Sequence, residues 1–130
     1  MKEIIISTII IFAIIIGNNI TQKYTIEFGE EMSNILNELK NEINNDENEI
    51  EEKSVNEKLE KIDKCWNQKR EKLAYFIEHN ELEKVENNMT TMRSFVNTKE
   101  YTQSISEIEE CIFILKHIEE KYAFNLENVF

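Results

Sequence analysis

Residues 4–20 read IIISTIIIFAIIIGNNI and contain no charged side chain. Nine of the thirteen residues from Ile4 to Ile16 are isoleucine. As a helix rising about 1.5 Å per residue, seventeen residues extend about 25 Å, close to the least that crosses the hydrocarbon core of a bilayer. The stretch therefore predicts a membrane helix at the start of the chain.

Three interpretations of this stretch compete. A signal peptide cleaved after Gly17 would normally begin with a more positively charged segment than Met1-Lys2-Glu3. A buried core helix would carry isoleucine on every face, more than one small domain can cover. We therefore favour an uncleaved signal anchor over residues 1–20, followed by a domain over residues 21–130.

The orientation of the anchor follows from the basic residues beside it. Lys2 and the amino terminus precede the apolar stretch, whereas Lys23 is followed by acidic residues. Positive charge is retained on the cytoplasmic side of membranes. We expect a single-pass protein of the cell membrane, with a cytoplasmic N-terminus and an extracytoplasmic domain.

The composition indicates helices and excludes several classes of site. The 130 residues include no proline and two glycines, and the formal net charge is −11. Proline and glycine mark the turns of β and α/β folds, and phosphate-binding loops need several glycines. A chain this acidic repels nucleic acid. We expect an all-α protein that binds no nucleic acid and is not an enzyme.

Beyond residue 20, apolar residues recur at steps of three and four, as on one face of a helix. Four such stripes with short connectors predict an antiparallel bundle of about four helices. A long two-stranded coiled coil formed by dimerisation is the alternative, which the connectors disfavour. The stripes are Tyr24, Phe28, Met32, Ile35, Leu39 and Ile43; Val55, Leu59, Ile62, Trp66, Lys69, Leu73 and Phe76; Leu82, Val85, Met89, Met92 and Val96; and Tyr101, Ile105, Ile108, Ile112, Leu115, Ile118 and Tyr122.

Local signals predict where these helices begin and end. The Asn- and Asp-rich residues 44–48 indicate a loop. The stretch Ser54-Val55-Asn56-Glu57 has the spacing of a capping box, which predicts the start of the second helix. Asn80 can end that helix and begin the third, and Asn97 precedes the fourth. The first helix has no clear stop after residue 20, so the anchor is expected to run into it.

His79, Glu81 and Glu83 are candidates for a binding site. His79 and Glu83 have the one-turn spacing at which two side chains can share a metal ion. A helix break at Asn80 would separate them, and the paired Glu-x-x-His motif of di-iron bundles is absent. We therefore expect His79 to serve the end of a helix, and we expect neither a metal ion nor another cofactor.

Two cysteines, and Trp66 and Lys69 of the second stripe, each have structural roles to predict. In an extracytoplasmic domain Cys65 and Cys111 could form a disulfide, which would contribute about 4 kcal/mol by closing a long loop. Alternatively, both are small buried hydrophobic residues. Trp66 is expected in the core, and Lys69 is expected either to extend to solvent or to pair with a carboxylate.

The apolar N-terminal helix, the mid-chain Trp66 and the sequence His79-Asn80-Glu81-Leu82 also carry a resemblance. The chain resembles a family of small proteins of unknown function from clostridia and other spore-forming Firmicutes. The resemblance implies a membrane-anchored helical bundle and no established activity.

Two functions follow as hypotheses. The first is a non-enzymatic interaction module that contacts the bilayer through residues 4–20 and binds another membrane protein or a second copy of itself. The second is an extracytoplasmic sensor domain that binds a ligand or metal with His79 and nearby glutamates.

Overall fold

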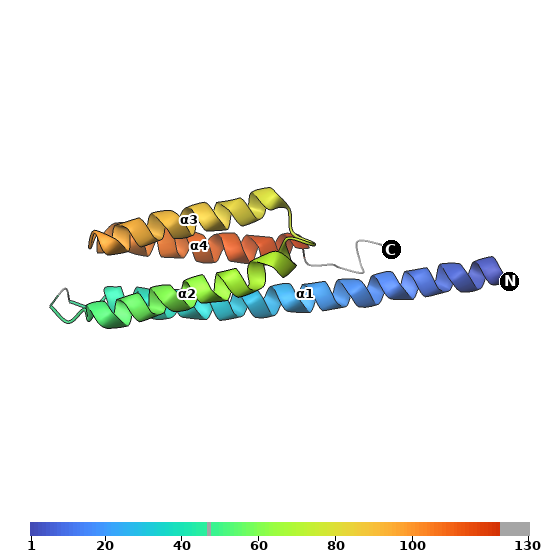
Figure 1. The fold of residues 1–130 in the computed structure, drawn as a ribbon, viewed down its shortest axis with the longest axis horizontal. Coiled ribbons are helices and arrows are strands. Elements are labelled where there is room, and N and C mark those ends of the chain that lie inside the picture. The colour runs from blue at the N-terminus through green and yellow to red at the C-terminus, as the bar shows by residue number, and fades with distance from the viewer. Residues whose placement is uncertain (47, 123–130) are drawn as a thin grey trace.

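A computed structural model describes residues 1–46 and 48–122 of the chain (Figure 1). They form α1 (Lys2–Ile43), α2 (Glu52–Leu73), α3 (His79–Asn97) and α4 (Tyr101–Tyr122), and this part of the chain contains no strand. The prediction of an all-α protein with four helices is confirmed. Glu47, in the first connector, and the tail from Ala123 lie outside the described residues.

Helix α1 is continuous over 42 residues, as expected from the absence of a stop signal after residue 20. At about 1.5 Å per residue it extends about 63 Å. Only its second half lies beside the other helices, while its first half projects from one end of the bundle (Figure 1). We call the end from which α1 projects the basal end.

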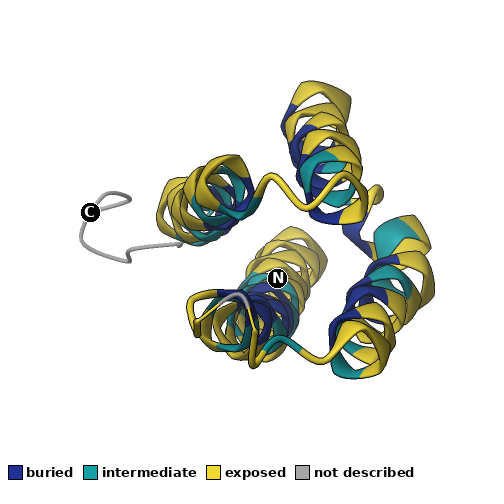
Figure 2. Ribbon diagram, turned by 90° about the vertical axis from the view of Figure 1, so that its left-hand side faces the viewer, coloured by how far each residue is buried: buried dark blue, intermediate teal, exposed yellow. Residues whose placement is uncertain are grey.

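The helices run alternately up and down and form a four-sided bundle, in the order α1, α2, α3, α4 around its axis (Figure 2). The closely packed pairs are α1–α2, α1–α4 and α3–α4. Their buried positions face one another in the middle of the bundle, as the predicted stripes require. The core comprises Phe28, Met32, Leu36, Leu39, Ile43, Val55, Leu59, Ile62, Cys65, Trp66, Leu73, Ile77, Leu82, Val85, Met89, Met92, Val96, Ile108, Cys111, Leu115 and Ile118.

The beginning of α2 differs from the capping-box prediction. The helix starts at Glu52, and its N-cap residue, Glu51, makes no side-chain capping hydrogen bond. Ser54 lies inside the first turn, where its hydroxyl group accepts a hydrogen bond from Lys58 Nζ at 2.9 Å. The capping-box prediction is wrong because the helix begins before Ser54, which therefore cannot be its N-cap residue.

The junction between α2 and α3 lies earlier than the sequence pattern predicts. Helix α2 ends at Leu73, and α3 already begins at His79, so His79 starts a helix rather than ending one. In the connector, the Ile77 N–H donates to the carbonyl of Leu73 at 2.8 Å, and the Ile77 side chain is buried. Phe76 packs against the core from this connector. Apolar residues thus continue the stripe after the helix has ended.

The turn between α3 and α4 reverses the chain without a glycine. Lys99 has φ 59°, the left-handed conformation that usually favours glycine at the end of a helix. The N–H groups of Lys99 and Glu100 donate to the carbonyls of Val96 at 3.1 Å and Phe95 at 2.9 Å. These bonds satisfy two carbonyl groups that the end of α3 leaves without a helical partner.

Candidate functional site

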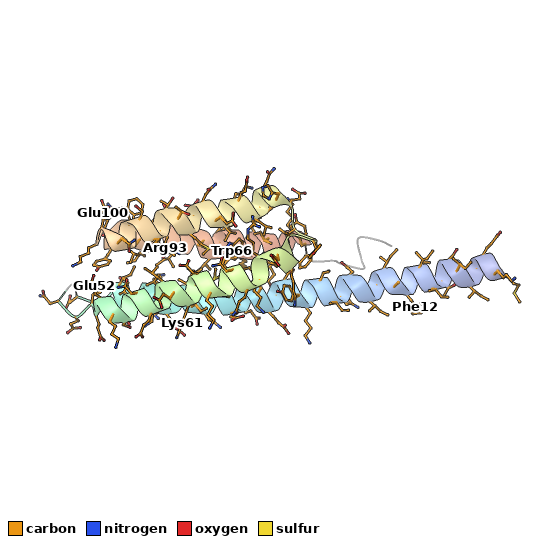
Figure 3. The ribbon with its side chains drawn as sticks, viewed as in Figure 1. Phe12, Glu52, Lys61, Trp66, Arg93 and Glu100 are labelled. Carbon is orange, nitrogen blue, oxygen red and sulfur yellow. The ribbon has the colours of Figure 1, made fainter. Side chains whose placement is uncertain are left out.

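The projecting half of α1 is an apolar surface without a protein partner among the described residues. Its isoleucines are largely solvent-exposed, and Phe12 is 61% exposed. Helix α1 is long and apolar enough to cross a membrane, and none of its most apolar window is buried in the structure. Phe12 lies on the part of α1 beyond the bundle (Figure 3). In this structure the apolar stretch is therefore not buried as a core helix of the bundle.

Aromatic and cationic side chains gather where α1 enters the bundle. The Tyr24 and Phe76 rings meet edge to face with centroids 6.1 Å apart. The ammonium groups of Lys69 and Lys72 lie 5.2 and 5.7 Å from the centroid of the Tyr24 ring, within cation–π range. Tyr75, in the same connector as Phe76, is 88% exposed. We call these five residues the basal cluster.

Lys69 therefore has a different environment from either of those predicted. It is partly buried, and its ammonium group faces the Tyr24 ring. Among the described side chains it forms no ion pair with a carboxylate. The π-face of Tyr24 provides the favourable electrostatic contact instead.

The three candidate ligands from the sequence separate into two groups. His79 and Glu83 both belong to α3, and His79 Nε2 lies 3.0 Å from Glu83 Oε1 on the exposed surface. The helix break that was expected to part them at Asn80 does not exist. Glu81 is only 4% exposed and belongs to the interior. Within residues 1–46 and 48–122, no three His, Cys, Asp or Glu side chains are grouped so that they could hold a metal ion.

Glu81 instead ties the start of α3 to the end of α4. Its Oε1 accepts hydrogen bonds from Lys84 Nζ at 3.2 Å and Lys121 Nζ at 3.3 Å. The backbone N–H of Glu78 donates to the Tyr122 hydroxyl at 2.9 Å. Burial alone would raise the pKa of Glu81, but the hydrogen bonds from the two lysines outweigh it and lower the pKa. This cluster is a structural tie between two helix ends.

A second polar network connects the neighbouring helices α2 and α3. Glu86 Oε1 accepts a hydrogen bond from Trp66 Nε1 at 3.2 Å and another from Arg70 Nε. The Arg70 hydrogen bond lowers the pKa of Glu86, against the smaller effect of burial, and the Trp66 bond lowers it further. Trp66 is 5% exposed and its ring lies 5.9 Å from that of Phe28, which confirms its predicted place in the core. Arg93 on α3 also pairs with Asp63 on α2.

One family model matches most of the chain. The model described as a domain of unknown function, DUF4363, matches residues 19–129. The chain belongs to the DUF4363 family. This confirms the expectation of a family of unknown function. No curated protein and no solved structure matches the chain.

The DUF4363 match begins where the apolar stretch of α1 ends. It covers the second half of α1 together with α2, α3 and α4. Residues 1–18, which form most of the exposed apolar surface, precede the match. The bundle is thus the part of the chain that the family defines.

The cysteines of the DUF4363 bundle are free thiols on different helices. Cys65 lies on α2 and Cys111 on α4, which are not among the closely packed pairs of helices. Both side chains are buried, as in the second of the two sequence alternatives. Burial is the largest cause that raises the pKa of Cys65 to about 11 and that of Cys111 to about 12. Neither thiol has the low pKa of a reactive cysteine.

The outer side of α1 and α4 offers an open surface. A groove of about 420 Å³ between these helices is lined by residues that include Gly29, Ser33, Ile112 and Glu119. Beside Ile112 in the sequence, Phe113 is 70% exposed on α4. Phe113 itself does not line the groove, so the groove and the exposed ring are separate features of α4.

Proposed function

We propose that this DUF4363 protein is a non-enzymatic, single-pass membrane protein that presents an acidic helical bundle to a protein partner. Residues 4–20 of α1 would cross the bilayer as an uncleaved anchor. The N-terminus would be cytoplasmic and the bundle extracytoplasmic. The observation that carries the proposal is the continuity of α1, which is one helix from Lys2 to Ile43, exposed and apolar in its first half and a wall of the bundle in its second.

The composition of the first half supports insertion. Each isoleucine or phenylalanine near the middle of a membrane helix contributes about −0.3 to −0.6 kcal/mol to insertion. The nine isoleucines between Ile4 and Ile16, together with Phe12, then contribute about −3 to −6 kcal/mol. The helical hydrogen bonds satisfy the backbone polar groups, as a lipid environment requires.

A binding role suits the polar groups of the bundle better than catalysis. Glu81 is bound by two lysines, and Glu86 is bound by Trp66 and Arg70. These carboxylates hold helices together, and both have lowered pKa values, so neither is poised as a general acid or base near neutral pH. The thiols are buried with raised pKa values, which suits packing rather than nucleophilic attack.

We place the partner contact on α4, at the exposed ring of Phe113. The partner would be another membrane protein or a second copy of the chain. The test is a photo-crosslinking amino acid at position 113 in the full-length protein in membranes. The matched control carries it at Lys61, an exposed position on α2.

The proposal expects a discrete crosslinked product from position 113 and none from position 61. A product of twice the protomer mass identifies self-association, and any other discrete mass identifies a different partner. Recovery of the monomer alone from both positions contradicts the assignment of this face.

A metal-sensing role is the second candidate, because His79 Nε2 and Glu83 Oε1 are 3.0 Å apart on one helical face. Two ligands alone form a weak site, and solvent would have to complete the coordination. Titration of the full-length protein with zinc, nickel and manganese tests it. A thermal shift that a His79→Ala variant loses would support sensing, and no shift would remove it.

A further inference from the structure

The basal cluster occupies a defined height above the apolar stretch of α1. Tyr24 follows Ile20 by four residues, which is about 6 Å along the helix axis. The headgroup layer on each side of a bilayer is about 5–8 Å thick. If residues 4–20 fill the hydrocarbon core, Tyr24 lies within the headgroup layer.

The connector between α2 and α3 lies at the same height as Tyr24. Phe76 contacts the Tyr24 ring, and Lys69 and Lys72 both face it. The connector is at the basal end, whereas Glu52 and Glu100 mark the opposite end (Figure 3). The 88% exposed ring of Tyr75 belongs to this connector, in a position where the bundle leaves it uncovered.

We infer that the basal cluster rests in the headgroup layer of the bilayer that α1 crosses, with Tyr75 inserted among the headgroups and Lys69 and Lys72 binding lipid phosphate groups. The inference rests on the proposed anchoring by α1. It adds a second attachment, formed by the α2–α3 connector, that sets the height and tilt of the bundle on the membrane.

The chemistry of the cluster suits this environment. Tyrosine favours the membrane–water interface because its ring is apolar and its hydroxyl group is polar. Lysine ammonium groups bind phosphate as point charges. Among the described side chains, neither Lys69 nor Lys72 pairs with a carboxylate, although the chain as a whole is strongly acidic. These cations are therefore available to lipid phosphates at the one end of the bundle that α1 directs towards the bilayer.

The test measures depth with an environment-sensitive fluorophore on a single introduced cysteine, in full-length protein reconstituted into phosphatidylglycerol nanodiscs. The three variants are Tyr75→Cys, Phe113→Cys and Phe12→Cys, all at exposed positions. The buried native thiols, with raised pKa values, react slowly with the label, and the unsubstituted protein measures their background. Nitroxide lipids quench the fluorophore either from the headgroup or from the acyl chain.

We expect headgroup nitroxides to quench the label at position 75 strongly. Acyl-chain nitroxides should quench the label at position 12, and neither kind of nitroxide should quench the label at position 113. Quenching at position 12 without headgroup quenching at position 75 overturns the inference and leaves the anchor standing. Absence of quenching at position 12 overturns the anchor and the inference together.

The role of the lysines has its own matched pair of variants. The first variant combines Tyr75→Cys with Lys69→Gln and Lys72→Gln. We expect it to show weaker headgroup quenching at position 75 than Tyr75→Cys alone. The control combines Tyr75→Cys with Lys61→Gln and Lys64→Gln, which make the same charge change on α2 further from the basal end. We expect the headgroup quenching at position 75 to stay unchanged in this control. Equal quenching in both double variants overturns the assignment of phosphate binding to Lys69 and Lys72.

Discussion

Replacing Glu86 with alanine is expected to lower the free energy of unfolding by about 1–3 kcal/mol. Trp66 is 5% exposed, and its Nε1–H donates to Glu86 Oε1 at 3.2 Å. Without this acceptor a buried indole N–H has no partner, which costs its full desolvation penalty. Arg70 also loses a hydrogen bond, but its guanidinium group is partly open to solvent and regains water, so its share is small.

The assay is urea unfolding of the full-length protein in detergent micelles, followed by far-ultraviolet circular dichroism. Glu83→Ala, one turn earlier on α3 in an exposed pair with His79, is the matched control and should change stability by less than about 0.5 kcal/mol. In a Trp66→Phe background, the cost of Glu86→Ala should fall to nearly nothing. The reasoning is refuted if Glu86→Ala costs no more than Glu83→Ala, or if its cost is unchanged in that background.

Three further predictions concern the bundle. Lys99→Gly should stabilise it by about 0.5–1 kcal/mol, because glycine adopts φ 59° without the steric cost that a Cβ brings; unchanged or lower stability in the same urea assay would contradict this. Cys65 and Cys111 should react slowly with a maleimide in the native protein and fully in urea, and rapid native labelling would contradict their burial. The pKa of Glu86 is lowered in the folded state. The ionised carboxylate therefore contributes fully to the free energy of unfolding above the unfolded-state pKa of about 4.3, and this contribution is lost as the pH falls through the folded-state pKa. The stability difference between the wild type and Glu86→Ala should therefore shrink from pH 7 to pH 3, and a constant difference would contradict the role of the carboxylate.

The number of helices and most of the core could be predicted from the sequence because they depend on a local pattern. The stripe from Leu82 to Val96 coincides with buried positions of α3, and the break after Ile43 coincides with the end of α1. The end of α2 near residue 76 could not be predicted from the sequence. The connector after α2 buries Ile77 and packs Phe76 against the core, as the side chains of a helix would be packed. The spacing of apolar residues indicates which residues pack against the core, and these two residues do so outside a helix.

The basal cluster was missed because it depends on contacts between helices. Lys69 stood out as the one charged residue of its stripe, and Tyr24 was the first residue of another stripe. Their contact requires the relative register of α1 and α2, which neither stripe specifies. The available signal was the exposed aromatic content of the connector, with Tyr75 and Phe76 following Lys72. The Trp66–Glu86 bond similarly joins residues on two helices.

The most direct test of membrane anchoring is alkaline carbonate extraction of membranes from cells that express the full-length chain, combined with the intact mass of the recovered protein. An uncleaved anchor predicts that the protein stays in the membrane pellet with residues 1–20 present. Recovery in the soluble fraction of a shortened chain that begins after Gly17 would contradict the central claim and identify the apolar stretch as a cleaved signal peptide.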